Sequence, residues 1–172
     1  MQRPCVITTA ALALAGLVTV TPATAQDKAS QTFLMKAMEG NLAEVQMGEL
    51  AQKNGQSAEV KSYGQMLQQD HNAANQKALA AAKKLGVNAP SAPSPKQKAD
   101  YDKMAKAQGA AFDKAFAKHM VMDHKKDIAE YKRAAKKNDE AAQYAKDSLP
   151  VLEKHLQTAE SLQKSAGKAA DR

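Results

Sequence analysis

Apolar side chains recur three or four residues apart along almost the whole chain beyond residue 30, which is the spacing of one face of an α-helix. This pattern predicts helices over 30–53, 57–86 and 110–137, and a further helix that starts after Asp139. The stripe of the last helix alternates steps of four and three residues, as in the seam of a helical bundle. Its members are Ala141, Ala145, Ser148, Leu152, His155, Ala159 and Leu162.

Residues with capping chemistry lie where these helices are predicted to begin. Ser57 is a candidate N-cap for the second helix, and Asp139 is one for the last. The stretch 94–97 reads Ser-Pro-Lys-Gln, a candidate capping box with proline at the first helical position, and it predicts a short helix over 95–107. Pro150 predicts a kink in the last helix, because proline removes a backbone donor.

Four amphipathic helices of similar length predict an all-α fold, an up-down-up-down four-helix bundle. The stretch "VNAPSAPSP" (87–95) is the one long connection, and the short helix follows it as an extra element. We expect a single domain over 26–172, with its core at about 30–163 and a flexible tail at 164–172.

The first 25 residues have the features of an export signal. Arg3 precedes an apolar run from Val6 to Val20, and Ala23–Ala25 has the small-x-small pattern that signal peptidases cleave. We therefore expect cleavage between Ala25 and Gln26 and a location in the periplasm or at the outer membrane. The apolar run is shorter than the roughly 20 residues that a membrane-spanning helix needs.

Cysteine usage and charge narrow the possible chemistry and partners. Cys5, the only cysteine, lies in the predicted leader, so the mature chain has no thiol for a disulfide, a nucleophile or a metal site. Loss of the leader removes one of 25 basic residues and leaves 24 against 18 acidic ones. The lysines are scattered and aromatic residues make up 4% of the chain, which argues against a nucleic-acid partner. The positive balance allows weak contact with an anionic membrane or envelope surface.

Three histidines on three predicted helices fall on inward stripes at similar depth. With the turns at 54–56 and 138–139 taken as one end of the bundle, His71 and His155 lie about 16 residues from that end and His124 about 14. At the rise of an α-helix, the three side chains should form one layer. Glu44 of the first helix lies somewhat nearer the end, but it leans toward the layer because side chains tilt toward their own helix N-terminus.

This layer has the ligand set of a metal site. Imidazoles of His71, His124 and His155 with the Glu44 carboxylate offer nitrogen and oxygen ligands suited to zinc, iron, manganese or copper(II). Asp70 and Asp123 each precede one of the histidines and could orient an imidazole or bind the metal directly. The alternative is structural, because buried histidines also hydrogen-bond to serine, asparagine or carboxylate groups and fix packing.

Other chemistry has weaker support in the sequence. Methionine thioethers select copper(I), and Met120 lies four residues before His124, but the methionines are spread over several helices and are ordinary core residues. There is no glycine-rich phosphate loop, no nucleophile elbow and no His-Glu-x-x-His motif. His119 is expected to lie at the periphery of the layer.

Five stretches in order resemble a family of exported bacterial proteins called domain of unknown function 4142. They are "NLAEVQMGELA" (41–51), "QQDHNAAN" (68–75), "GAAFDKAF" (109–116), "MDHKKDIAEY" (122–131) and "LPVLEKHL" (149–156). The resemblance implies a ferritin-like four-helix architecture in the periplasm or outer membrane, and it implies no established activity. The family's characteristic polar residues fall on Glu44, Asp70, His71, His124 and His155.

The sequence departs from di-iron ferritin-like enzymes, which carry Glu-x-x-His pairs on two helices. The residues three before the histidines are Gln68, Val121 and Leu152. We therefore expect an exported, non-enzymatic helical protein of the cell envelope that binds one metal ion in its core. A purely structural or interaction module and a metal-dependent oxidoreductase are the alternatives.

Overall fold

The structure is a computed structural model that describes the backbone of residues 25–170 and the side chains of residues 28–167. The described part is all-helical, with five helices and no strand. The helices are α1 (Ala25–Asn54), α2 (Ala58–Lys84), α3 (Pro95–Met104), α4 (Gly109–Ala134) and α5 (Glu140–Ala170). The predicted leader lies outside the described residues except for Ala25, so the export signal and its cleavage stay predictions.

The predicted caps are confirmed. Ser57 accepts a hydrogen bond from the backbone N–H of Val60, and Ser94 forms the full capping box with Gln97. The Asp139 carboxylate accepts from the backbone N–H of Ala142 at 2.8 Å and so caps α5.

Several helix ends differ from prediction: α1 begins at Ala25 instead of residue 30, and α4 ends at Ala134 instead of residue 137. The short helix stops at Met104 because the chain then tightens into a turn, in which the Lys106 and Ala107 N–H groups donate to carbonyls three residues back. At the other end of the chain, α5 continues through Pro150 and through most of the predicted tail, up to Ala170.

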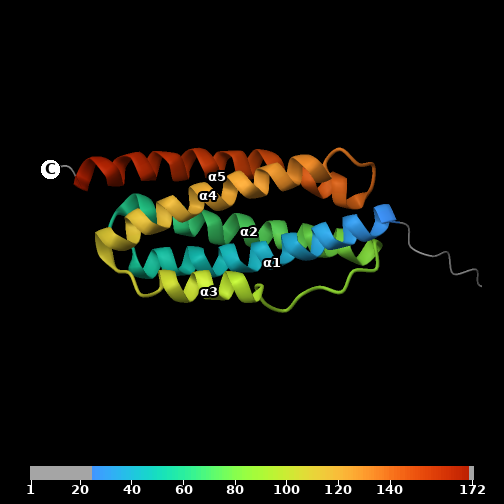
Figure 1. The fold of residues 1–172 in the computed structure, drawn as a ribbon, viewed down its shortest axis with the longest axis horizontal. Helices are drawn as coiled ribbons and strands as arrows, with labels where there is room; N and C mark the ends of the chain where they lie inside the picture. Colours follow the sequence, from blue (N-terminus) through green and yellow to red (C-terminus); the bar gives the residue numbers. More distant parts are fainter. Residues whose placement is uncertain (1–24, 171–172) are drawn as a thin grey trace, which may run out of the picture.

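The four long helices lie side by side, and α3 packs on the outside of α1 (Figure 1). The α1–α2 turn and the start of α4 share one end of the molecule, where Gly55 pairs with Gly109. The Asp113 carboxylate on α4 ties this end together, because it accepts from the backbone N–H groups of Gln56 and Ser57, each at 2.9 Å.

The opposite end joins the start of α1, the end of α2 and the α4–α5 turn. Ser30 on α1 donates to the Asp139 carboxylate at 2.5 Å. Lys84 at the end of α2 forms an ion pair with Glu140, the first residue of α5, at 2.9 Å.

This arrangement corrects the predicted up-down-up-down order, because α2 and α4 run in the same direction (Figure 1). The segment 85–94 and α3 carry the chain back along the outside of α1 to the end where α2 began. A short loop would have forced antiparallel neighbours, whereas this long crossover permits parallel ones. Among the described residues, none of the helices combines the length and the hydropathy that a membrane-spanning segment requires.

The buried core divides into two apolar clusters along the length of the helices. One cluster, near the α1–α2 turn, is built around Tyr63, Leu67, Phe112 and Phe116. The other, toward the α4–α5 turn, contains Leu34, Met38, Ile128, Tyr131 and Tyr144 among others. Polar side chains are buried between them: Asn41, Glu44, His71, His124 and His155. The middle of the core is therefore polar.

The stripe of α1 explains why this was only partly visible in the sequence. Leu42 and Val45 continue the apolar spacing of Leu34 and Met38 along α1, but both are only half-buried. Asn41 and Glu44 take the inward positions instead. All seven predicted members of the α5 stripe are buried.

The α1 and α2 backbones approach closely at a pair of glycines. A Cβ atom at Gly48 would lie 2.5 Å from the Gly64 carbonyl oxygen, and one at Gly64 would lie 2.6 Å from the Gly48 carbonyl oxygen. Both distances are far below van der Waals contact, so this crossing needs glycine on both helices.

We expect Gly48→Ala to lower the free energy of unfolding by about 1–3 kcal/mol, because the added methyl group must push two backbones apart. Gly40→Ala, in the same helix, is the control, since its Cβ would meet only the Gln97 amide nitrogen at 3.9 Å. There, alanine should stabilise by up to about 1 kcal/mol through helix propensity. Urea unfolding followed by circular dichroism measures both; equal effects of the two substitutions would contradict the close crossing.

Candidate metal centre

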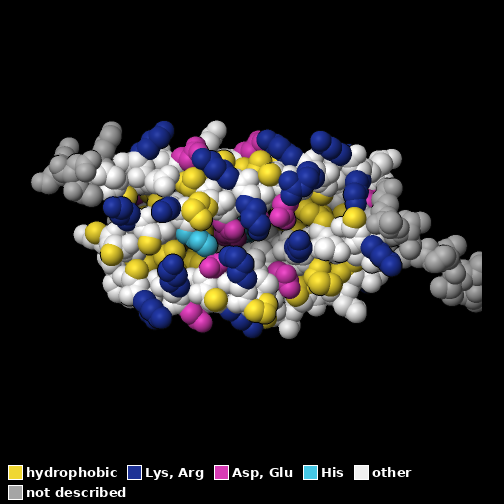
Figure 2. Space-filling view, viewed as in Figure 1, with side chains coloured by type: hydrophobic (Ala, Val, Ile, Leu, Met, Phe, Trp, Pro, Cys, Tyr) yellow, Lys and Arg dark blue, Asp and Glu magenta, His cyan; other side chains and the backbone are white. Residues whose placement is uncertain are grey.

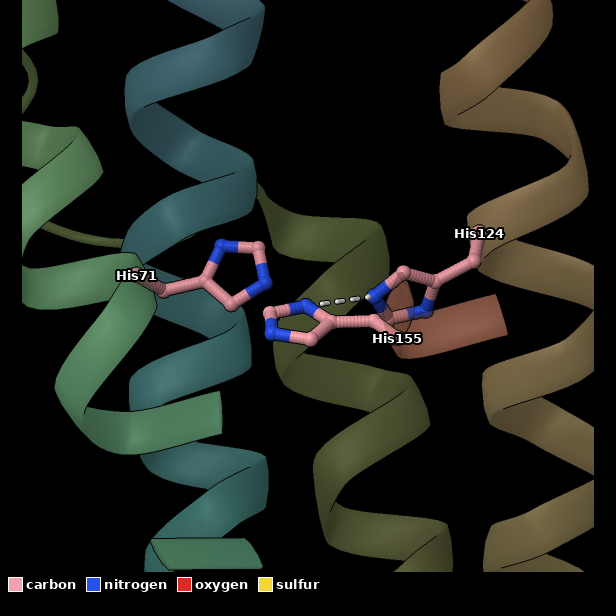
Figure 3. Close-up of side chains that lie close together, drawn as sticks. All are labelled: His71, His124 and His155. Atoms are coloured by element: carbon pink, nitrogen blue, oxygen red, sulfur yellow. Dashed lines mark hydrogen bonds between the residues drawn. The ribbon is translucent and has the colours of Figure 1, made fainter. Parts of the chain in front are cut away.

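Three histidines from three helices meet in the polar middle of the core. His71 of α2, His124 of α4 and His155 of α5 have only 5%, 2% and 0% of their surface exposed. Their ring centroids lie 5.3 to 6.0 Å apart. One ring nitrogen from each residue lies within 4.8 Å of the corresponding nitrogens of the other two (Figure 3). The prediction that these three histidines lie together in one layer of the core is therefore confirmed.

The reason for the meeting differs from the one predicted. The turns at 54–56 and 138–139 lie at opposite ends of the molecule, not at the same end. The histidines still share a depth because each lies near the middle of its helix, where distance from either end is nearly the same.

The outer nitrogen of each ring is held by an oxygen acceptor. His71 Nδ1 lies 3.0 Å from the Asn41 side-chain oxygen. His124 Nδ1 lies 3.0 Å from the Met120 carbonyl oxygen, and His155 Nε2 lies 2.9 Å from the Asp70 carboxylate. Carbonyl and carboxylate oxygens only accept hydrogen bonds, so each of these ring nitrogens carries the proton and donates.

The three inner nitrogens are then left with lone pairs in neutral rings. His124 Nε2 and His155 Nδ1 face each other at 3.3 Å. His71 Nε2 is buried and has no hydrogen-bond partner among the described residues. Figure 3 shows this nitrogen turned toward the other two rings. Such a convergence of lone pairs, each backed by an acceptor on the far side of its ring, is the arrangement found around metal-bound histidines.

Without a cation, two lone pairs repel at this distance, so the His124–His155 contact lengthens in the metal-free protein unless a proton enters between the two nitrogens. The extra proton is opposed by the surroundings. Burial, and after it the neighbouring His155, lower the pKa of His124 to about 4. Burial also lowers the pKa of His71 well below its usual range and lowers that of His155, against the raising effect of Asp70. The site therefore favours neutral imidazoles.

The distances suit a small metal ion. With metal–nitrogen bonds of about 2.0–2.1 Å, neighbouring nitrogens of a tetrahedral site lie about 3.4 Å apart. The His124–His155 separation of 3.3 Å already matches this value. All three nitrogens lie within 4.8 Å of one another, so at most a small movement of His71 brings the group to this spacing.

The predicted carboxylates have divided roles. Asp70 binds the outer nitrogen of His155, as expected for a residue that orients an imidazole. Asp123 instead lies within hydrogen-bonding reach of the Glu44 carboxyl group. Neither Glu44 nor Asp123 belongs to the described group whose ligand atoms lie within 4.8 Å of one another.

Three groups around the site were not predicted as parts of it. The Met120 carbonyl holds His124, and Tyr144 receives a hydrogen bond from the Asn41 amide nitrogen at 3.0 Å, which fixes the Asn41 oxygen toward His71. Asp127 lies beside Glu44 and raises its pKa. The sequence carries a signal only for Asp127, which follows Asp123 by one helical turn on the same face.

A cavity of about 150 Å³ reaches the site from the side of α2 and α5. Asp70, His71 and His155 are among its lining residues. The cavity therefore reaches His71 and His155, whereas His124 is not among its lining residues.

We expect the metal-free protein to hold His71 and His124 as neutral rings with the proton on Nδ1, and His155 with its proton on Nε2. Long-range proton–nitrogen NMR spectra of chelator-treated protein at pH 7 report these tautomers directly. The His124 signals should stay constant on acidification to about pH 5, because its pKa is about 4. A proton on Nε2 of His71 or His124 would contradict the assigned geometry.

The comparisons with known proteins give a family but no function. A family model described as Domain of unknown function (DUF4142) matches residues 17–162. No curated protein and no solved structure matches the chain. The match covers most of the sequence and includes all three histidines, so this chain belongs to the DUF4142 family.

Proposed function

We propose that this protein binds one metal ion through His71, His124 and His155 and acts as an exported metal-binding protein of the cell envelope. The observation that supports the proposal is the convergence of one ring nitrogen from each histidine, with an oxygen acceptor on the far side of every ring. A purely structural histidine layer would satisfy both nitrogens of each ring with hydrogen bonds. Here His71 Nε2 has no partner within the described residues.

The ligand set favours a borderline divalent ion. Three neutral imidazoles suit zinc, iron(II) or copper(II), and they suit manganese less well, because manganese prefers oxygen ligands. Three protein ligands leave one tetrahedral position for water. Glu44 does not need to enter this coordination shell, and the proposal for the histidine site rests on the imidazoles alone.

We also propose that the fold is a ferritin-like four-helix bundle. The single long crossover between α2 and α4 supports this, since ferritin-like folds have one such connection. Di-iron chemistry is not part of the proposal, because no Glu-x-x-His pair accompanies the histidines. A binding role is therefore favoured over oxidoreductase activity.

Cobalt(II) is the sharpest probe, because its visible absorption is intense in four-coordinate sites and weak in six-coordinate ones. We expect one equivalent of cobalt(II) to bind the chelator-treated protein with an intense visible band, and zinc to displace it. His124→Gln and His155→Gln should abolish the band. His119→Gln, a substitution on the same helix as His124 but outside the three-histidine group, should leave it unchanged.

Thermal unfolding gives a second readout on the same samples. A ligand at 100 times its dissociation constant stabilises the folded state by about 2.7 kcal/mol. Zinc should therefore raise the melting temperature of the wild type and of His119→Gln, but not of His155→Gln. Metal binding that survives both histidine substitutions would refute the proposed site.

Asp70 offers a test of the outer hydrogen bonds. We expect Asp70→Asn to weaken zinc binding about 10- to 100-fold, because the amide no longer fixes the His155 tautomer with a full negative charge. Asp102→Asn, on the exposed surface of α3, is the control. Isothermal titration calorimetry measures both affinities; equal affinities for the two variants would show that Asp70 does not support the site.

A further inference from the structure

A second cavity, of about 290 Å³, opens on the other side of the histidines, between α1, α3 and α4. Figure 2 shows acidic side chains gathered near the middle of this face, with lysine and arginine side chains around them. The cavity reaches inward as far as His71 and Glu44. It is many times larger than the space that one buried water needs.

Carboxylates outnumber cationic side chains around this cavity. The acidic lining residues are Glu39, Glu44, Asp100, Asp123, Asp127 and Glu130, and the lysines are Lys36, Lys96 and Lys126. Lys96 is paired with Asp100 at 2.6 Å, and Lys126 approaches Asp127 only to 3.8 Å. Neither Glu44 nor Asp123 forms an ion pair with a lysine or arginine among residues 28–167.

Within this excess of carboxylates, the Glu44 side chain has an oxygen atom that lacks a hydrogen-bond partner. Its side chain lies in the core with 4% of its surface exposed, and its Oε2 atom has no hydrogen-bond partner among the described residues. A buried carboxylate oxygen without a partner is costly. Burial raises the pKa of Glu44 well above its usual range, and the carboxylates of Asp123 and Asp127 raise it further. A cation at this position would give Oε2 a partner, offset the cost of burying the carboxylate, and screen its repulsion from Asp123 and Asp127.

We propose that this cavity is a second cation site, in which Glu44, Asp123 and Asp127 bind a hydrated hard divalent ion of the manganese(II), magnesium or calcium class. Glu44 comes from α1, and Asp123 and Asp127 lie one helical turn apart on one face of α4. Only oxygen ligands from these residues are involved, which is the set that hard ions prefer. The site is separate from the histidine centre and does not depend on it.

The spacing of the carboxylates explains why the ion keeps water. The described carboxylates do not form a group whose ligand atoms all lie within 4.8 Å of one another, as the three histidines do. They are therefore too far apart to enclose a bare ion in this conformation. Water molecules complete the shell of a hard ion readily, and magnesium in particular retains several. The size of the cavity accommodates them.

Manganese(II) is the probe of choice, because electron paramagnetic resonance counts the free aqueous ion directly. We expect the chelator-treated wild type, with zinc filling the histidine centre, to bind one equivalent of manganese(II). Glu44→Gln and Asp127→Asn should each weaken this binding at least tenfold. Glu49→Gln, an exposed glutamate on the same helix as Glu44 but outside the cavity, is the control and should leave it unchanged.

His155→Gln separates the two sites. It should abolish zinc binding at the histidine centre and leave the affinity for manganese(II) within about twofold of the wild type. Circular dichroism of each variant is the control for folding. Glu44→Gln replaces a buried carboxyl group with an amide of nearly the same size, so it is expected to fold.

Three results would overturn the proposal. They are no saturable manganese(II) binding by the wild type, unchanged binding by Glu44→Gln and Asp127→Asn, and loss of manganese(II) binding in His155→Gln. The last would place manganese(II) at the histidine centre. The first two would leave Glu44 and Asp123 as a carboxyl pair that shares a proton. Failure of zinc binding alone would refute the histidine centre and leave this site standing.

Discussion

The burial of three imidazoles in the middle of a helical core is the constraint on which the other features of this molecule depend. Polar groups in such a place are tolerated only when their hydrogen bonds are made inside the protein. Asn41, Met120 and Asp70 supply one acceptor to each ring from α1, α4 and α2. The Asn41–His71 bond thus ties α1 to α2 and the Asp70–His155 bond ties α2 to α5, in addition to the apolar clusters on either side of the layer.

The same constraint creates the chemistry. Because every outer nitrogen is held as a donor, every inner nitrogen presents a lone pair, and burial opposes the protons that would otherwise cover them. We propose that the packing that specifies the core also holds these three nitrogens in position for a metal ion. Glu44 is likewise a buried ionisable group, but it carries a negative charge when ionised. Burial and the neighbouring carboxylates disfavour that charge, so a cation nearby would stabilise it. Two neighbouring regions of one core thus favour cations of different hardness.

Helix periodicity and capping residues predicted most of the fold. The α5 stripe and the caps at Ser57, Ser94 and Asp139 depend on local chemistry, which a sequence displays directly. The predicted direction of α4 was wrong. The path of the proline-rich crossover is decided by its packing on α1 rather than by the residues of the crossover itself. The inward place of Asn41 was also hidden, since apolar spacing alone favoured Leu42 and Val45, whereas the inward place of Glu44 was predicted. Contacts such as Asn41 with Tyr144 need the register between helices, which periodicity does not supply.

The most direct test of a three-imidazole metal centre is X-ray absorption spectroscopy of the zinc-loaded protein. The account predicts a four-coordinate first shell at about 2.0–2.1 Å, with multiple-scattering features of three imidazole rings and one further light ligand. A shell of oxygen ligands without imidazole scattering, or with only one ring, would contradict it.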